Sequence, residues 1–199
     1  MGEERLKPPV PLESIVLPPL RENAPFQEAL AAALRSDQIR NDHLERVVHA
    51  YGKSFRDLWR IRQGIIHAAP DLVVYLESER DVLAIVQAAH AHEVAVVPFG
   101  GGSNIVGSLE ALDAQGRMVV SLDLKRMNRV LSVDQRSCTA IIQPGVLGPD
   151  MEDQLNAQGV TLGHFPDSFE FSTLGGWVAT RSAGMQSDKY GKIEDMVLS

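Results

Sequence analysis

The spacing of hydrophobic positions changes near residue 66 and divides the chain into two kinds of structure. Over about residues 26–35, and again over about residues 42–62, apolar residues recur at the spacing of an amphipathic helix. Farther along the chain, short apolar runs alternate with turn residues, which is typical of strands. The pattern predicts a helical N-terminal region over residues 26–66 and a domain of mixed strands and helices over residues 67–199.

A β-α-β unit is predicted at the start of this domain. Residues 72–76 form a short apolar run typical of a buried strand, and residues 79–92 have helical spacing after Ser78, a suitable N-cap. The second strand, over residues 94–97, leads into three consecutive glycines, Gly100–Gly102. We expect this glycine loop at the carboxyl end of a strand, where ligands of open α/β sheets bind.

Strand signals dominate beyond the glycine loop, over residues 118–124, 129–133 and 139–143. Their close spacing favours antiparallel neighbours over crossover connections. One further helix is predicted over residues 149–158, between a proline and a glycine. Residues 194–199 have the pattern of a strand at its start, so we expect the chain to be incomplete at its C-terminus. The predicted fold class is α+β, in two subdomains.

The first 25 residues are rich in proline, with pairs at Pro8-Pro9 and Pro18-Pro19. Proline fixes φ and lacks an N–H group, so this composition disfavours a helix and predicts an extended arm over residues 1–25. An arm laid over the protein surface and a flexible tail fit the composition equally well.

Composition narrows the class of protein. The apolar content of 44% and the charged content of 23% are typical of a soluble globular protein. A net charge of -7 argues against a general nucleic-acid binder. The only cysteine, Cys138, permits no internal disulfide, and its alternating apolar surroundings predict a small buried thiol in a reducing compartment. Because we find neither a signal-peptide pattern nor a membrane span, we expect a cytoplasmic location.

The glycine loop is the first candidate for chemistry. Glycines allow backbone N–H groups to converge on an anion, and Pro98 is expected to end the strand where the loop begins. Ile105 stands where a dinucleotide fingerprint needs its third glycine, and no Gly-Lys-Ser/Thr follows. The loop is therefore of neither the Rossmann nor the Walker type, and taken alone it is equally compatible with a flexible connection.

A second segment, His164–Gly184, combines hydroxyl groups, glycine amides and one arginine. Ser172 or Thr173 can cap a short helix that continues through Thr180, and the Gly175-Gly176 pair leaves the first turn of that helix open. An open helix N-terminus favours anions. The segment is therefore a second candidate for anion binding.

Together these motifs resemble the flavin-binding half of the vanillyl-alcohol oxidase and p-cresol methylhydroxylase superfamily. Within it, the chain is most similar to the alkyldihydroxyacetone-phosphate synthase family and its bacterial FAD-linked oxidase relatives. The resemblance runs from about Tyr51 to the end of the chain. Its motifs are Pro98–Asn104, Gly163–Trp177, Thr180–Met185 and Tyr190–Asp195.

The resemblance implies a two-subdomain p-cresol methylhydroxylase-type FAD-binding domain, preceded by the helical N-terminal region. The glycine loop would wrap the FAD pyrophosphate, and the other two segments would contact the rest of the dinucleotide and the flavin edge. The implied cofactor-binding residues are Pro98, Phe99, Gly100, Gly101, Gly102, Ser103, Asn104, Asp167, Ser168, Phe169, Glu170, Phe171, Ser172, Thr173, Gly175, Gly176, Thr180, Arg181, Ser182 and Ala183. Relatives that bind flavin covalently through the loop carry a histidine there, whereas this loop has Gly, Ser and Asn, so we expect noncovalent FAD.

The implied activity is that of an FAD-dependent enzyme that exchanges the acyl group of acyl-dihydroxyacetone phosphate for a fatty alcohol, in ether-lipid synthesis. The family's substrate domain follows the flavin domain, so we expect the catalytic residues beyond residue 199 and no activity from these residues alone. One alternative is an FAD oxidoreductase of a 2-hydroxy acid such as D-lactate or glycolate. Another is a nucleotide-binding module that is not an enzyme. A lipid or small-molecule substrate, peripheral membrane association and a homodimer are further expectations.

His164, Arg181 and the two tryptophans have side chains that could serve in chemistry, binding or packing. We interpret His164 as a structural hydrogen-bonding group beside the cofactor rather than a proton shuttle. Arg181 is as suited to a phosphate or the flavin as to an ordinary surface role. Trp59 and Trp177 are expected to pack in the core or beside the flavin. We expect no metal site, because the sequence has no ligand set with zinc-site spacing.

Overall fold

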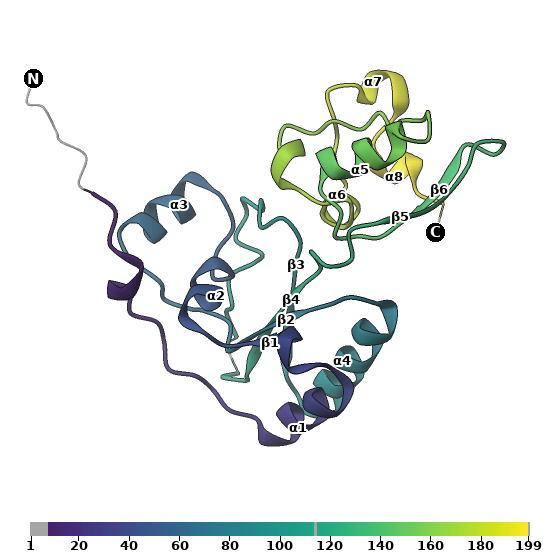
Figure 1. The fold of residues 1–199 in the computed structure, drawn as a ribbon. Coiled ribbons are helices and arrows are strands. Elements are labelled where there is room, and N and C mark those ends of the chain that lie inside the picture. Colours follow the sequence, from purple (N-terminus) through teal and green to yellow (C-terminus); the bar gives the residue numbers. More distant parts are fainter. Residues whose placement is uncertain (1–7, 114, 199) are drawn as a thin grey trace, which may run out of the picture.

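A four-stranded sheet forms the centre of the first subdomain in the computed structural model, which describes residues 8–113 and 115–198 (Figure 1). The strand order is β1-β2-β4-β3, with β2, β4 and β3 parallel and β1 antiparallel to β2. The strands are β1 (Ile39–Arg40), β2 (Leu72–Tyr75), β3 (Ala95–Phe99) and β4 (Val119–Asp123).

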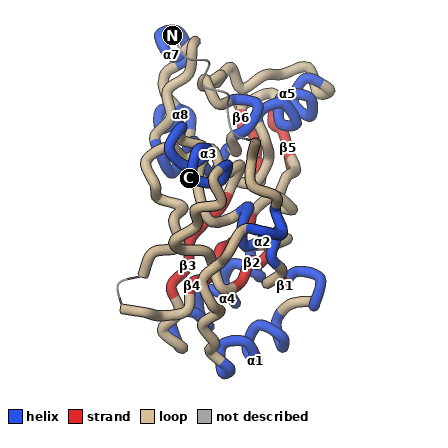
Figure 2. The backbone as a smooth tube through the Cα atoms, turned by 90° about the vertical axis from the view of Figure 1, so that its left-hand side faces the viewer, coloured by secondary structure: helices blue, strands red, loops and turns tan. Residues whose placement is uncertain are grey.

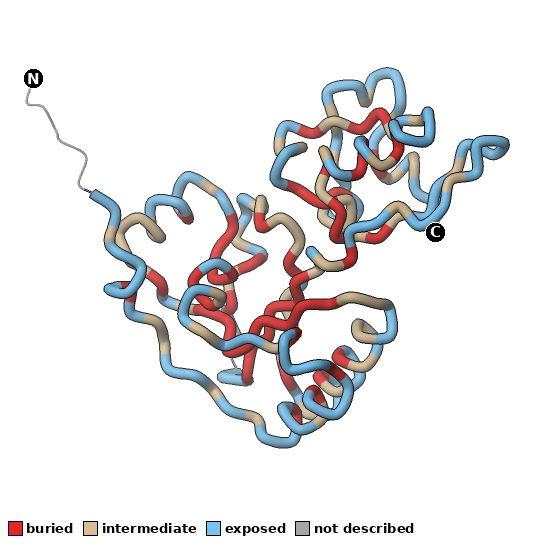
Figure 3. Tube along the Cα trace, in the orientation of Figure 1, coloured by how far each residue is buried: buried red, intermediate tan, exposed pale blue. Residues whose placement is uncertain are grey.

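Helices cover both faces of this sheet. Helices α1 (Ala24–Ala33) and α4 (Glu79–Ala91) lie together over one face, and α2 (His43–Val48) lies over the other (Figure 1). Ser78 caps α4 as predicted, since its side chain accepts a hydrogen bond from the Asp81 N–H. The sheet and the α1–α4 layer enclose one core, whose fully buried members include Phe26, Leu30, Val74, Ile85 and Val120. Burial concentrates on the central strands β2 and β4, whose residues are all buried (Figure 3).

The prediction of antiparallel strands beyond the glycine loop is wrong for β4. This strand lies parallel between β2 and β3, with Val120 opposite Leu72 on one side and Val96 on the other. All five residues of β4 are buried, which is typical of a central parallel strand covered on both faces. The long segment over residues 100–118 carries the chain back, so no crossover helix is needed.

Two local expectations in this subdomain also fail. Pro98 does not end the ladder, because β3 continues to Phe99; β3 is an edge strand, where a missing N–H is tolerated. Residues 42–62 form two helices, α2 and α3 (Phe55–Arg62), instead of one. The chain turns between them at Gly52, whose Cα presses on the Asn104 carbonyl so closely that a Cβ would lie 1.9 Å from that oxygen.

The second subdomain combines a hairpin with short helices. Strands β5 (Val130–Asp134) and β6 (Thr139–Ile142) are antiparallel, as predicted. The helices of this subdomain are α5 (Gly148–Asn156), α6 (Leu174–Thr180), α7 (Ser187–Tyr190) and α8 (Ile193–Met196), with the 3-10 turn η3 (Phe169–Phe171) before α6. Two further 3-10 turns, η1 (Leu12–Ser14) and η2 (Ser36–Gln38), lie in the N-terminal part of the chain. The two subdomains occupy opposite ends of the molecule (Figure 2).

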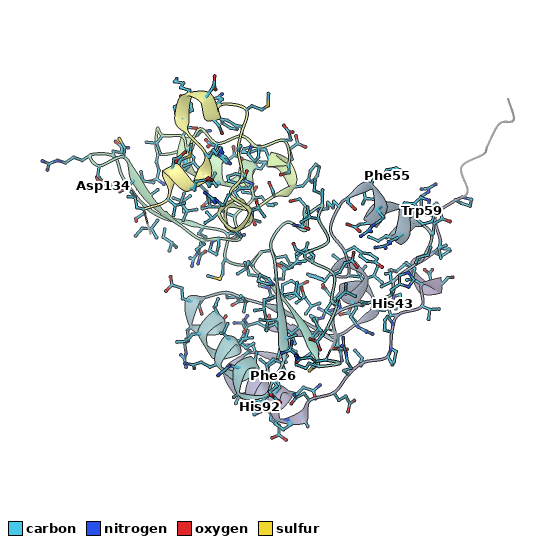
Figure 4. All side chains as sticks on the ribbon, turned by 180° about the vertical axis from the view of Figure 1, so that it is seen from behind. Phe26, His43, Phe55, Trp59, His92 and Asp134 are labelled. Atoms are coloured by element: carbon cyan, nitrogen blue, oxygen red, sulfur yellow. The ribbon has the colours of Figure 1, made fainter. Side chains whose placement is uncertain are left out.

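The predictions for the C-terminal residues, for Cys138 and for Trp59 are also wrong. Residues 193–196 form helix α8 rather than a strand, since the Asp195 carboxylate accepts the Lys192 N–H and closes a helical turn; Ser199 lies outside the described residues. Cys138 is exposed at the β5–β6 turn, in a left-handed conformation with φ +54°, rather than buried. Trp59 is 49% exposed on α3, and Phe55 is 87% exposed beside it (Figure 4).

The described part of the proline-rich arm, residues 8–25, lies on the first subdomain. Ile15 is buried in a small cluster with Val47 and Tyr51, and the Arg21 side chain pairs with buried Asp71 at 3.0 Å. The described arm residues thus pack on the first subdomain, while residues 1–7 of the predicted arm lie outside the described residues. Within residues 8–113 and 115–198, no helix has the length and apolar character needed to cross a bilayer.

Candidate cofactor site

The glycine loop and the second predicted segment are in direct contact. A Cβ on Gly101 would lie 1.8 Å from the carbonyl oxygen of Phe171, and a Cβ on Gly100 would lie 2.3 Å from Thr173 Oγ1. Only hydrogen can occupy these positions, so glycine is required for the two backbones to approach. The fold thus joins two stretches that lie about seventy residues apart in the sequence.

The rest of the loop is shaped by a left-handed glycine and by the Asn104 side chain. Gly102 has φ +66° and lies against the ring of Phe99, at the end of β3. The side chain of Asn104 accepts the N–H groups of Val106 and Ser108, both at 3.1 Å, and so fixes the following turn. These bonds shape the loop without using the N–H groups of its glycines.

Helix α6 begins beside this loop, as predicted. Thr173 is its N-cap and accepts the Gly176 N–H at 3.4 Å. The two glycines of the first turn differ. A Cβ on Gly175 would meet Pro144 at 2.7 Å, whereas one on Gly176 would meet no described atom closer than 3.4 Å. Gly176 therefore leaves space that nothing in the described chain fills, and this space suits an approaching ligand.

Two predicted hydroxyl groups serve the scaffold of the second segment. The Ser172 hydroxyl accepts the indole N–H of Trp177 at 2.6 Å and donates to the Ser168 carbonyl at 2.7 Å. The Ser168 hydroxyl donates to Ser172 Oγ at 3.0 Å. Trp177 itself is 2% exposed and stacks on Phe169, so its prediction as a packing residue is confirmed. Asp167 and Glu170, from the same predicted set, are exposed.

The third predicted segment, the turn Thr180–Ala183, leaves α6 at a left-handed residue. Arg181 has φ +54°, is 76% exposed in its side chain and pairs with Glu194 at 3.1 Å. Ser182 shares a hydrogen bond with His164 Nε2 at 3.0 Å. His164 is therefore a structural hydrogen-bonding group, as predicted. It is 1% exposed, and its burial lowers its pKa.

His164 also has an unused ring nitrogen. Its Nδ1 is buried and has no hydrogen-bond partner among the described residues. An unpaired buried nitrogen is unfavourable, which is consistent with a group that receives its partner from a ligand or from elsewhere.

Sequence reasoning missed two polar contributions to this region. The Lys53 ammonium donates to the Gly101 carbonyl at 2.6 Å. His49 and Asp123 form a buried pair at 3.0 Å, and the His49 ring lies 4.3 Å from that of Phe99. Lys53 lies in the turn between α2 and α3, His49 is the C-cap of α2 and Asp123 ends β4, so no local motif marks them. Among the described residues, no group of three metal-ligating side chains comes together.

Comparison with known proteins identifies this arrangement. Residues 70–199 match the family of FAD-binding domains. The chain belongs to that family. It is 52% identical over 192 residues to an alkyldihydroxyacetonephosphate synthase from Dictyostelium discoideum, covering 96% of this chain and 31% of the relative. It is 46% identical to a synthase of the same name from Trypanosoma brucei brucei, covering 100% of this chain and 33% of the relative.

Solved structures of FAD-binding relatives agree in fold. A structure of an alkyldihydroxyacetonephosphate synthase superposes with a TM-score of 0.95 at 51% identity, covering 97% of this chain and 37% of that one. A p-cresol methylhydroxylase structure, at 21% identity, has a TM-score of 0.63 over 83% of this chain and 31% of that one, and shows the fold alone. The predicted α+β, p-cresol methylhydroxylase-type fold is confirmed. The chain spans about a third of the length of these relatives.

The residues of the site fit FAD, the cofactor of the family. The glycine loop offers backbone N–H groups that the hydrogen bonds among residues 8–113 and 115–198 leave unused, and Gly176 opens the first turn of α6 beside it. Such groups suit a pyrophosphate. The individual contacts of the predicted residues with FAD stay predictions.

Proposed function

We propose that this chain is the cofactor-binding part of an alkyldihydroxyacetonephosphate synthase, an enzyme that exchanges the acyl group of acyl-dihydroxyacetone phosphate for a fatty alcohol. The observation that carries the proposal is the extent of the similarity: the 52% identity covers 96% of the chain and so includes the arm and helices that precede the FAD-binding domain. A likeness confined to the cofactor loops would fit an oxidoreductase as well.

In this function the residues of the chain bind and orient the cofactor. The backbone of Gly100–Gly102 holds the phosphates, Phe171 and Thr173 brace the loop, and the turn after α6 lies near the flavin. FAD supplies, when bound, a ring that accepts and returns an electron pair. We place the proton-transfer groups and the substrate site in a domain outside these residues.

FAD binding is proposed to be noncovalent, because the glycine loop has Gly, Ser and Asn where covalently flavinylated relatives carry a histidine. The visible absorption spectrum, taken after adding FAD and removing the excess by desalting, tests this. We expect a flavin spectrum that stays with the folded protein and is released on denaturation. Flavin that remains on the denatured protein would contradict the noncovalent assignment.

The proposed exchange activity is tested with the full-length protein that the gene encodes. Acyl-dihydroxyacetone phosphate and a fatty alcohol should yield the alkyl product and a free fatty acid, with no electron acceptor present. Mass spectrometry of both products measures the exchange. Turnover of D-lactate or glycolate that depends on an added acceptor, without exchange, would instead establish the oxidoreductase alternative. FAD binding without either reaction would favour a binding module.

A cytoplasmic location, peripheral association with membranes and a homodimer are proposed with this function. The single cysteine supports a reducing compartment. A substrate with long alkyl chains supports contact with a membrane surface. Sedimentation of the protein with lipid vesicles, and its mass in solution, test the last two proposals.

A further inference from the structure

The turn between α2 and α3 is fixed on the glycine loop, although it precedes the FAD-binding domain, whose match begins at residue 70. The Lys53 N–H donates to the Asn104 carbonyl at 2.9 Å, and Gly52 presses on the same carbonyl. The backbone of the turn is thereby held against the loop. The backbone position of Lys53, from which its side chain extends, is therefore fixed relative to the cofactor site.

The Lys53 ammonium lies where the two cofactor segments meet. It donates to the Gly101 carbonyl at 2.6 Å and lies 5.8 Å from the centre of the Phe171 ring. Gly101 belongs to the loop and Phe171 to the segment packed on it. The ammonium has three donor hydrogens, of which the carbonyl takes one.

Lys53 differs from the other basic residues of this region in lacking a carboxylate partner among the described residues. Arg56 and Arg60, one and two turns along, both pair with Glu110 at 3.3 Å. Nor does Lys53 cap α3, because the Ser54 hydroxyl accepts the Asp57 N–H at 3.1 Å. The Lys53 side chain is exposed, and desolvation by its surroundings lowers the pKa of its ammonium; an anion beside it would offset that effect.

We propose that Lys53 is a cofactor-binding residue that makes an ion pair with the pyrophosphate of FAD, from outside the FAD-binding domain. The inference rests on the cofactor site described above. Backbone N–H groups of the loop and one fixed cation then share the two phosphate charges. The helical N-terminal region, through this residue, contributes to cofactor affinity and not only to the fold.

Titration of the apoprotein with FAD, followed by flavin fluorescence at low and high salt, tests the proposal. Lys53→Gln should weaken FAD binding about tenfold, as expected for loss of one charge-assisted hydrogen bond, and should reduce the salt dependence of binding. Lys53→Arg should keep most of the affinity. Arg136→Gln, at the distant β5–β6 turn, removes the same charge and should bind FAD like the unaltered protein.

The melting temperature of each apoprotein separates binding from folding. We expect the Lys53→Gln apoprotein to have the same melting temperature as the unaltered apoprotein. Equal FAD affinity in Lys53→Gln and Arg136→Gln would overturn this inference and leave the cofactor site intact. Failure of Lys53→Arg to restore the affinity for FAD would also overturn it. So would an equal weakening, in Lys53→Gln, of the binding of riboflavin, which lacks the pyrophosphate. Neither result follows from an ion pair with a phosphate. Failure of the unaltered protein to bind FAD would overturn the proposed function as well.

Discussion

Gly101 and Gly176 lack side chains for different reasons. At Gly101 the position of a Cβ is taken by backbone, 1.8 Å from the Phe171 carbonyl oxygen; at Gly176 the position is open. The sequence shows both as members of glycine-rich runs and cannot distinguish them. The first glycine allows two segments to pack, whereas the second leaves room beside the loop for a ligand.

Alanine substitutions separate these roles. Gly101→Ala should push the loop off residues 171–173, lower the melting temperature of the apoprotein and weaken FAD binding more than tenfold. Gly176→Ala should stabilise α6 by about 0.5–1 kcal/mol, because alanine restricts the unfolded chain, yet still weaken FAD binding. Thermal unfolding without FAD and titration with FAD measure both effects. Unchanged FAD affinity in Gly176→Ala would show that the cofactor does not approach this turn.

His164 gives the stability of the protein a pH dependence. Its burial lowers its pKa below the ordinary value of 6.5, so between these two pKa values the unfolded chain binds a proton that the folded chain does not. The free energy of unfolding should therefore rise with pH in this window and fall as the solution becomes more acidic than about 6.5. Urea unfolding from pH 7 to pH 5 should show a smaller loss for His164→Asn than for the unaltered protein. Parallel curves would contradict the assignment.

Elements were predicted best where local pattern decides them. Helix α4 was expected over residues 79–92 and is found over residues 79–91, because its cap and its apolar face lie within one stretch of sequence. The break between α2 and α3 and the direction of β4 were missed. Both depend on contacts with distant residues: Gly52 with Asn104, and β4 with strands on either side.

A buried carboxylate, Asp71, is one of the groups that hold the N-terminal arm to the sheet. Asp71 is 1% exposed and accepts the Val119 N–H at 2.8 Å and the Arg21 N–H at 2.9 Å, besides pairing with the Arg21 side chain. Asp71→Asn should lower the free energy of unfolding by about 3 kcal/mol, since an amide cannot accept at both positions and leaves donors unpaired. Arg40→Gln, which breaks an exposed pair, is the control and should change much less. Chemical denaturation measures both.

The whole molecule could be assigned to its fold from sequence because the FAD-binding loops need glycines and hydroxyl groups in continuous runs. Lys53 could not be found in this way, since it reaches the loop only through the packing of a preceding turn. The first subdomain shows the same dependence: its core includes Phe26 and Leu30, and its edge strand β1 precedes residue 70. We therefore expect the FAD-binding domain to need the preceding residues in order to fold.

A shortened chain that begins at residue 70 tests this conclusion. It would leave the β2 edge without β1 and expose the surface that Phe26 and Leu30 cover, so it should aggregate or lack cooperative unfolding. A chain that begins at residue 8 keeps these contacts and should unfold cooperatively. Circular dichroism during heating compares the two. Cooperative unfolding of the shorter chain would contradict the expectation.

The exposed cysteine at the hairpin turn makes the protein convenient for spectroscopy. Cys138 is the only thiol in the chain, so a maleimide dye reacts at one known position without prior mutagenesis. The flavin absorbs blue light and can quench such a dye by energy transfer. The arrival of FAD in the cofactor site would then be followed in real time from the brightness of a single label at the β5–β6 turn.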